Sequence, residues 1–215
     1  MALKIMDETM KATPEEAYER LTEAMEYAIV NGARISSHSY GMSNCQKDSI
    51  LSSMFSTMLT KAPKHILVAS AGNRRNCNDD NPHCPCNTDA PNALCVAASN
   101  KDNERWFDSN YGRESVHVFA PGENITSLWI DGNENVYAYD SGTSMAAPHV
   151  AGLAALILSI NKDLDGERVK KYILDNVQKR PQYLDWVSSD GMIDVEKTLK
   201  DLSMPPCCTS FLNNC

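Results

Sequence analysis

Two segments near the amino end of the chain carry apolar residues at helical spacing. The first starts with Thr13 as N-cap, Pro14 as the first helical residue and Glu16 as the capping-box partner, and it ends at Asn31-Gly32. The second has one apolar face over about three turns. Later helices follow the cap residues Asp165 and Asp194. The predicted helices span residues 14–30, 50–59, 144–160, 165–178 and 194–202, and that at 144–160 is the most apolar.

Short apolar or alternating runs between these helices predict strands. Residues 65–70 form the kind of apolar run that is buried on both faces of a parallel sheet. Residues 127–130 and 136–139 flank Asp131-Gly132 and predict a hairpin. The other predicted strands are at residues 2–6, 33–39, 94–98 and 116–120.

The alternation of strands with helices predicts an α/β fold, a three-layer α/β/α arrangement around a mainly parallel sheet. We expect one domain over residues 1–202 and a cysteine-rich tail at 203–215. Such sheets bind ligands at the carboxyl ends of their strands. Chemistry is therefore expected at Ser39-Tyr40-Gly41, at Ala71-Gly72-Asn73 and where a helix begins at Ser144.

Composition and charge narrow the function classes. A chain of 215 residues with 42% hydrophobic and 22% charged residues has the make-up of a globular protein, which excludes a disordered one. A net charge of −8 disfavours nucleic acid and anionic membranes as partners. The apolar stretch 150–160 is shorter than the roughly 20 residues that a membrane span needs. The first residues lack the apolar core of a signal peptide.

The eight cysteines are clustered, which favours disulfides and an oxidising compartment. Cys77, Cys84, Cys86 and Cys95 lie in one loop and allow three pairings, among which the sequence does not choose. A zinc site is the alternative, but the loop lacks paired Cys-x2-Cys knuckles. The remaining cysteines are Cys45, Cys207, Cys208 and Cys215.

A serine at the start of the long apolar helix is suited to be a nucleophile. Ser144 follows Gly142-Thr143, and the helix start offers unpaired N–H groups that stabilise a developing oxyanion. Small residues along the helix let it pack tightly on the sheet. Serine is also a favoured N-cap residue, so a purely structural role stays open on these grounds.

The string Gly-Thr-Ser-Met-Ala-Ala-Pro-His-Val-Ala-Gly at residues 142–152 resembles the catalytic-serine signature of the subtilisin-like serine proteases, the subtilases. Residues 68–73 resemble the strand of that family that ends in the oxyanion-hole asparagine. Further similar segments, at residues 28–41, 119–122 and 193–195, occur in the order of the family. The resemblance covers residues 2–202 and implies a subtilisin-like fold.

The resemblance also implies a reaction, peptide-bond hydrolysis through an acyl-enzyme on Ser144. The Ser144 N–H and the Asn73 side-chain amide would hold the oxyanion. Ser39-Tyr40-Gly41 and Ser70-Ala71-Gly72 would flank a polypeptide substrate by pairing with its backbone. Without the resemblance, the sequence predicts only that Asn73 is a turn residue and that residues 39–41 and 70–72 form ordinary turns.

Two family motifs are not matched. In subtilases an Asp-Thr/Ser-Gly motif follows the first strand, and a His-Gly-Thr-His segment opens a helix; neither precedes the matching residues here. The five histidines all read as structural residues. We therefore expect an N-terminally incomplete domain, completed by a missing N-terminal segment or accompanied by a pro-segment.

The rival interpretation is an inactive pseudoprotease that binds peptides or protein partners in the retained cleft. No cofactor is predicted; many subtilases bind calcium, but no ligands for it can be assigned in this sequence. The family and the cysteine content together imply a secreted or secretory-pathway protein.

Overall fold

A six-stranded sheet forms the centre of the computed structural model, which describes residues 1–5, 13–43, 45, 49–132 and 134–203. The strand order is β1-β3-β5-β6-β10-β9, and neighbours are parallel except for the last pair. The strands are β1 (Ile35–His38), β3 (Ile66–Ser70), β5 (Ala93–Ser99), β6 (Val118–Pro121), β10 (Gly191–Met192) and β9 (Gln178–Lys179).

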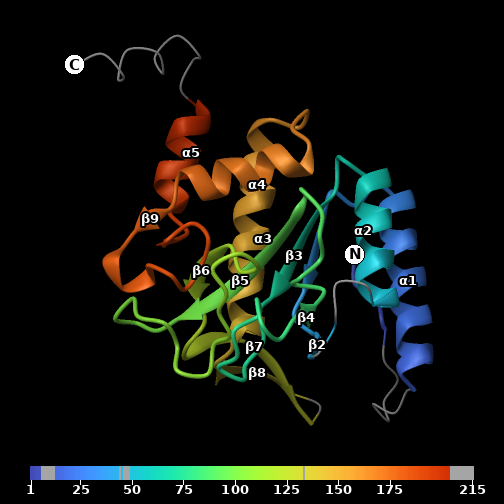
Figure 1. Cartoon of the computed structure of the whole chain (residues 1–215), viewed down its shortest axis with the longest axis horizontal. Helices are drawn as coiled ribbons and strands as arrows, with labels where there is room; N and C mark the ends of the chain where they lie inside the picture. The colour runs from blue at the N-terminus through green and yellow to red at the C-terminus, as the bar shows by residue number, and fades with distance from the viewer. Residues whose placement is uncertain (6–12, 44, 46–48, 133, 204–215) are drawn as a thin grey trace.

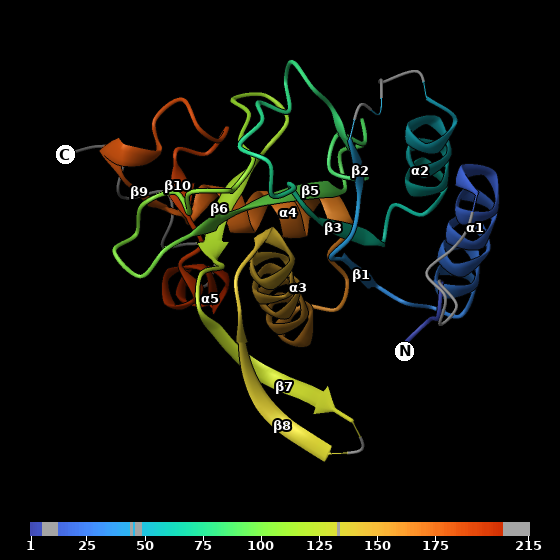
Figure 2. The same ribbon diagram turned by 90° about the horizontal axis from the view of Figure 1, so that it is seen from below.

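Helices cover both faces of this sheet (Figures 1 and 2). On one face, α1 (Pro14–Val30) and α2 (Ile50–Lys61) enclose an apolar cluster with Leu67 and Ala69 of β3. On the other face, Ile66 and Val68 pack with α3 (Thr143–Ile160) and α4 (Gly166–Asp175), beside α5 (Val195–Ser203). All five residues of β3 are buried, because successive side chains point to opposite faces and both faces are covered. The predicted three-layer α/β/α fold is confirmed.

Most predicted elements form close to their expected bounds. The capping box that starts α1 is present: Glu16 N donates to Thr13 Oγ1 at 3.2 Å, and Thr13 N donates to Glu16 Oε2 at 2.9 Å. The predicted hairpin consists of β7 (Ile125–Asp131) and β8 (Glu134–Asp140), which extends away from the sheet in Figure 2.

Some expectations are wrong. Residues 2–5 form no strand, and Met6 lies outside the described residues; Ile5 packs against the cluster on the α1 side of the sheet. The helix that Asp165 caps ends at Asp175, because Gln178 pairs with Met192 in the sheet. Several short elements were not expected: the antiparallel pair β2 (Met42–Ser43) and β4 (His83–Cys84), the strands β9 and β10 of the central sheet, and a 3-10 helix at Pro181–Tyr183. The tail at 204–215 lies outside the described residues.

The structure pairs Cys45 with Cys84 and Cys86 with Cys95. The expectation that the four cysteines of the loop pair with one another is therefore wrong. Pairing of β2 with β4 brings Cys45 beside Cys84, whereas Cys77 is held by a bridge to Tyr111 and has no disulfide partner among the described residues. Disulfides, and not a zinc site, occupy this loop.

Helix α3 has the length and apolar composition of a membrane span. Its apolar residues include Val150, Leu153 and Ile157, which are buried against the sheet. In this structure α3 is the central helix of a packed layer.

Candidate active site

Ser144 lies in the first turn of α3, at the edge of the sheet where the parallel strands have their carboxyl ends. The N-cap of this helix is Gly142, whose N–H donates to Gly122 O at 2.7 Å. The interpretation of Ser144 as an N-cap is therefore wrong, and its hydroxyl makes no cap bond. Ser144 Oγ donates to Ser39 O at 3.1 Å, and Ser39 Oγ donates to Ser144 O at 2.7 Å.

Asn73 is exposed and is oriented by Thr143. Its Oδ1 accepts hydrogen bonds from Thr143 N at 3.0 Å and from Thr143 Oγ1 at 2.8 Å. The amide nitrogen of Asn73 has no hydrogen-bond partner among the described residues and lies 3.0 Å from the position that a Cβ on Gly142 would take. Anchoring one end of the amide leaves the other end available as a donor beside the turn that carries Ser144.

The backbone N–H of Ser144 also has no hydrogen-bond partner within the described part of the chain. The next two N–H groups, those of Met145 and Ala146, both donate to Gly142 O. The two predicted oxyanion donors, Ser144 N–H and the Asn73 amide, thus stand at one helix start with free N–H groups. Both groups are therefore candidate donors to an oxyanion.

The segments predicted to flank substrate lie side by side, because β1 and β3 are adjacent and parallel, with His38 opposite Ala69. Ser39, Tyr40 and Gly41 follow β1. Ser70 ends β3, and Ala71 and Gly72 follow it.

The segment after β3 has little backbone left for a substrate. Ala71 N donates to Val96 O, Gly72 N donates to Thr143 Oγ1 at 3.0 Å, and Gly72 O accepts from Asn110 N at 2.8 Å. Gly72 has a φ of +104°, which favours glycine, and a Cβ there would overlap the Asn110 amide. This segment can therefore line the path of a substrate, whereas backbone pairing fits the segment after β1 better.

Sequence reasoning missed Thr143 and Asn110, which hold this site together. Asn110 is buried; its Nδ2 donates to Ala71 O at 3.0 Å, and its Oδ1 accepts from Arg74 N at 2.8 Å and Asn76 N at 3.1 Å. The position of Thr143 beside Ser144 could have suggested its role. Nothing in the sequence around Asn110 marks it.

None of the five histidines hydrogen-bonds to Ser144 Oγ. His149 is exposed on α3, and its Nδ1 bonds to Met145 O at 2.9 Å. His38 is buried between Tyr40 and Ser36, and burial together with the charge of His65 lowers its pKa to about 3.

The other three histidines have structural surroundings. His65 bonds to Ser36 Oγ at 2.8 Å and to Ala33 O at 2.7 Å. Burial lowers the pKa of His117 to about 3 and that of His83 to about 4.

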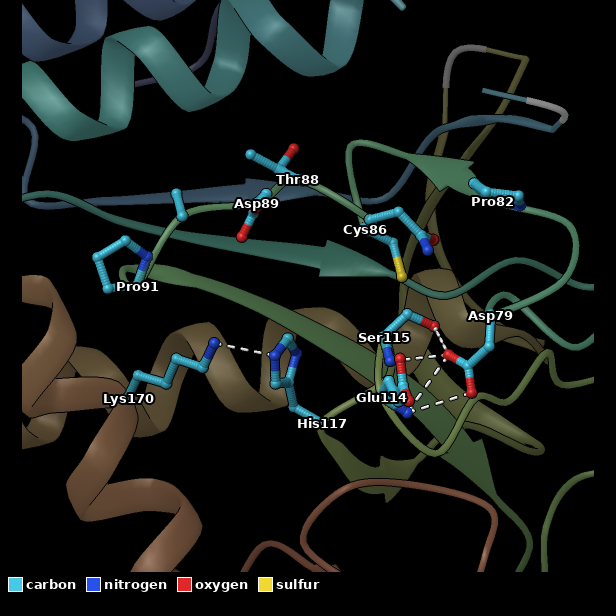
Figure 3. A pocket seen from close by; sticks show the side chains of 12 residues that line it. Asp79, Pro82, Cys86, Thr88, Asp89, Pro91, Glu114, Ser115, His117 and Lys170 are labelled. Carbon is cyan, nitrogen blue, oxygen red and sulfur yellow. Dashed lines mark hydrogen bonds between the residues drawn. The ribbon is translucent and has the colours of Figure 1, made fainter. Parts of the chain in front are cut away.

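A separate cavity of about 490 Å³ lies at the amino ends of β5 and β6 (Figure 3). There Lys170 Nζ lies within hydrogen-bond distance of His117 Nε2, at 2.9 Å, and donates to Ala93 O at 2.6 Å. Burial lowers the pKa of Lys170 to about 8. None of the predicted site residues lines this cavity, so it is not part of the candidate active site.

No group of three or more His, Cys, Asp or Glu side chains that could hold a metal ion occurs in the described ranges. These residues therefore form no carboxylate cluster of the kind that calcium prefers.

The profile of the Subtilase family matches residues 2–192. The chain belongs to the subtilase family. It is 36% identical over 138 residues to "Subtilisin-like protease 2" of Plasmodium falciparum, which covers 64% of this chain and 10% of that protein. It is 46% identical over 110 residues to "Subtilisin-like serine protease Rho m 2.0101" of Rhodotorula mucilaginosa, with coverages of 50% and 29%.

Solved subtilase structures have the same fold. A protease from Pseudoalteromonas arctica superposes with a TM-score of 0.76 at 23% identity, over 90% of this chain and 60% of that one. The prenylagaramide maturation protease PagA gives 0.73 at 26% identity, over 92% and 71%. The subtilase chain described here thus spans less than a third of the length of the two curated relatives and most of the length of PagA.

Proposed function

We propose that this subtilase chain carries the nucleophile and oxyanion donors of a serine endopeptidase. The observation that carries the proposal is that the turns after β1 and β3 both hydrogen-bond to the first turn of α3. These bonds bring Ser144, Asn73 and a substrate-flanking segment into one cluster. A plain helix cap would require none of this arrangement.

In the proposed reaction, Ser144 Oγ attacks a peptide carbonyl and forms a C–O bond. The carbonyl oxygen gains negative charge and is held by Ser144 N–H and the Asn73 amide. When the intermediate collapses, the C–N bond breaks and the leaving amine receives the proton that the hydroxyl gave up. Water then hydrolyses the acyl-enzyme by the reverse sequence of proton transfers.

The hydroxyl proton of Ser144 must be accepted by a base during the attack. In the structure Ser144 Oγ donates to Ser39 O, and a backbone carbonyl is not such a base. We propose that another polypeptide segment supplies the imidazole and the acid that orients it. Two features support docking of a segment beside β1. Among the described residues β1 pairs on one side only, with β3. A cavity of about 450 Å³ also runs along this edge, between Ile35, Ser37 and Ala151.

The lack of a histidine partner for Ser144 in the described residues favours a second candidate function, a pseudoprotease that binds peptides. Cleavage of a quenched fluorescent peptide library by the protein isolated from its source distinguishes the two. A protease loses turnover on Ser144→Ala and retains peptide binding. If the isolated protein binds peptides but cleaves none, endopeptidase function is excluded and the second candidate holds.

We further propose that the protein resides in the secretory pathway or outside the cell. The two disulfides support this location, because such bonds persist in oxidising compartments. Mass measurement of iodoacetamide-treated protein from its source should show these four cysteines unalkylated.

A further inference from the structure

One sequence motif lies outside the candidate active site, the N-glycosylation sequon Asn124-Ile125-Thr126. It is the one Asn-x-Ser/Thr triplet in the 215 residues. In the structure it stands where the chain enters the hairpin, with Asn124 directly before β7 and Thr126 inside that strand. Both residues are exposed, so the folded protein has room for an oligosaccharide on Asn124.

The backbone of Asn124 is held in place, whereas its side chain is available. Its N–H donates to Ser141 Oγ at 2.9 Å. In the part of the chain that the structure describes, neither the Asn124 amide nor the Thr126 hydroxyl has a hydrogen-bond partner. The φ of Asn124 is +53°, a left-handed conformation that asparagine adopts more readily than most residues. A turn asparagine needs no hydroxyl two residues later, so Thr126 distinguishes a glycosylation site from a plain turn.

The hairpin also presents an apolar face that the described residues leave uncovered. Thr126 is directly opposite Tyr139, and the two therefore share this face. The next pair on the same face is Leu128 with Tyr137. Leu128 is 70% exposed, Tyr137 76% and Tyr139 74%. Folded proteins rarely leave large apolar side chains together without cover, and the sequon stands at the end of this face.

A sugar ring suits an aromatic surface of this kind. One side of a pyranose consists of C–H bonds, whose hydrogens carry partial positive charge, and the face of an aromatic ring is negative. Directly opposite residues of an antiparallel pair have Cβ atoms about 5 Å apart, so Tyr139 stands next to Thr126 of the sequon. The sugar hydroxyl groups stay in water. The first sugars on Asn124 thus cover Tyr139 without burying a polar group.

We propose that Asn124 carries an N-linked oligosaccharide whose first sugars lie on Tyr139 and shield the apolar face of the hairpin. In its formation Asn124 Nδ2 bonds to the anomeric carbon of an oligosaccharide carried on a lipid diphosphate. The bond from that carbon to the diphosphate oxygen breaks, the lipid diphosphate leaves with the electron pair, and the amide gives up one proton. The proposal rests on the secretory location proposed above and is independent of the peptidase reaction.

The first test uses the protein isolated from its source and digested with trypsin. The peptide that spans residues 114–162 contains the sequon, since no lysine or arginine occurs between Arg113 and Lys162. We expect this peptide to carry the added mass of N-acetylhexosamine and hexose. Peptide N-glycosidase should remove that mass and convert Asn124 to aspartate. An unmodified peptide overturns the proposal.

Variants made in the same cells separate the sequon from the turn. Thr126→Ala should abolish the added mass although Asn124 is unchanged, whereas Thr126→Ser should retain it. Asn135→Gln is the matched control, because Asn135 is an exposed asparagine of the same hairpin that belongs to no sequon. It should also retain the added mass. A glycan that persists in Thr126→Ala overturns the assignment to this site.

Hydroxyl-radical footprinting of the native protein tests the shielding. After peptide N-glycosidase treatment, the modification rates of Tyr137 and Tyr139 should rise. That of Tyr27, which is 54% exposed on α1, should stay the same. Equal rates for Tyr139 before and after treatment overturn the shielding role.

Two further readouts on the same sample separate this proposal from the earlier ones. Intact disulfides with an unmodified sequon overturn the glycan alone, whereas alkylated Cys45, Cys84, Cys86 and Cys95 with an unmodified sequon overturn the secretory location as well. Absence of fluorophosphonate labelling on Ser144 contradicts the peptidase function and leaves the glycan result standing.

Discussion

At the scale of single residues, the site depends on how Thr143 is bonded. Its hydroxyl accepts from Gly72 N and donates to Asn73 Oδ1, so one side chain fixes both the turn after β3 and the Asn73 amide. Thr143 is fully buried and does not reach the reacting atoms. In the proposed reaction it is a positioning residue, whereas Ser144 and Asn73 would act on the substrate directly.

Replacing Asn73 by leucine should lower kcat while KM changes little, because the amide bonds the oxygen only as it becomes charged. The expected loss is about 10²- to 10³-fold, the magnitude known for an oxyanion-hole asparagine in subtilisin. Steady-state kinetics on one peptide substrate measures it. An unchanged kcat would show that Asn73 is a turn residue only.

Thr143→Val should also lower kcat, because the Asn73 amide loses one of its two anchors and Gly72 N loses its acceptor. Thr143→Ser keeps the hydroxyl and should restore most of the rate. A purely structural role for Thr143 predicts lower thermal stability with kcat intact. Measuring kcat, KM and Tm for both variants distinguishes the two roles.

At the scale of elements, local signals located most of the fold. The Thr13–Glu16 capping box and the apolar run of β3 depend only on residues that are close together in the sequence. Both predictions are confirmed. The β2–β4 pair and the Cys45–Cys84 bond join residues about forty positions apart, which no local pattern encodes. Likewise the resemblance to the family marked Ser144 and Asn73, but Asn110 reaches the site through tertiary contacts alone.

The two disulfides should stabilise the fold unequally, because they close loops of different length. Their sequence separations are 39 and 9 residues, for which loop-closure entropy gives about 4 and about 2.5 kcal/mol. Urea unfolding should therefore show a larger loss for Cys45→Ala/Cys84→Ala than for Cys86→Ala/Cys95→Ala. The reverse order would mean that packing around β5, and not loop closure, dominates.

At the scale of the whole molecule, buried neutral histidines make the fold sensitive to acid. The pKa values of His38 and His117 are lowered to about 3 and that of His83 to about 4, whereas unfolded histidine titrates near about 6.5. Below pH 6.5 the unfolded chain therefore binds more protons than the folded one. The stability that these residues contribute is complete above that pH and is lost as the pH falls toward 4 and 3.

Each of these histidines should lower the free energy of unfolding by up to about 1.4 kcal/mol per pH unit in that window. Urea midpoints measured from pH 7 to pH 4.5 should fall steadily. His117→Asn should show a shallower slope than the wild type, since one titrating group is removed. A flat profile would contradict the assignment of these rings as buried and neutral.

The central claim is that Ser144 is an activated nucleophile. The most direct measurement is reaction of the protein isolated from its source with a fluorophosphonate, followed by mass spectrometry of its peptides. We expect one adduct, on Ser144, that is absent from a Ser144→Ala variant of the same protein. A folded protein that forms no adduct, or forms it on another residue, would contradict the claim.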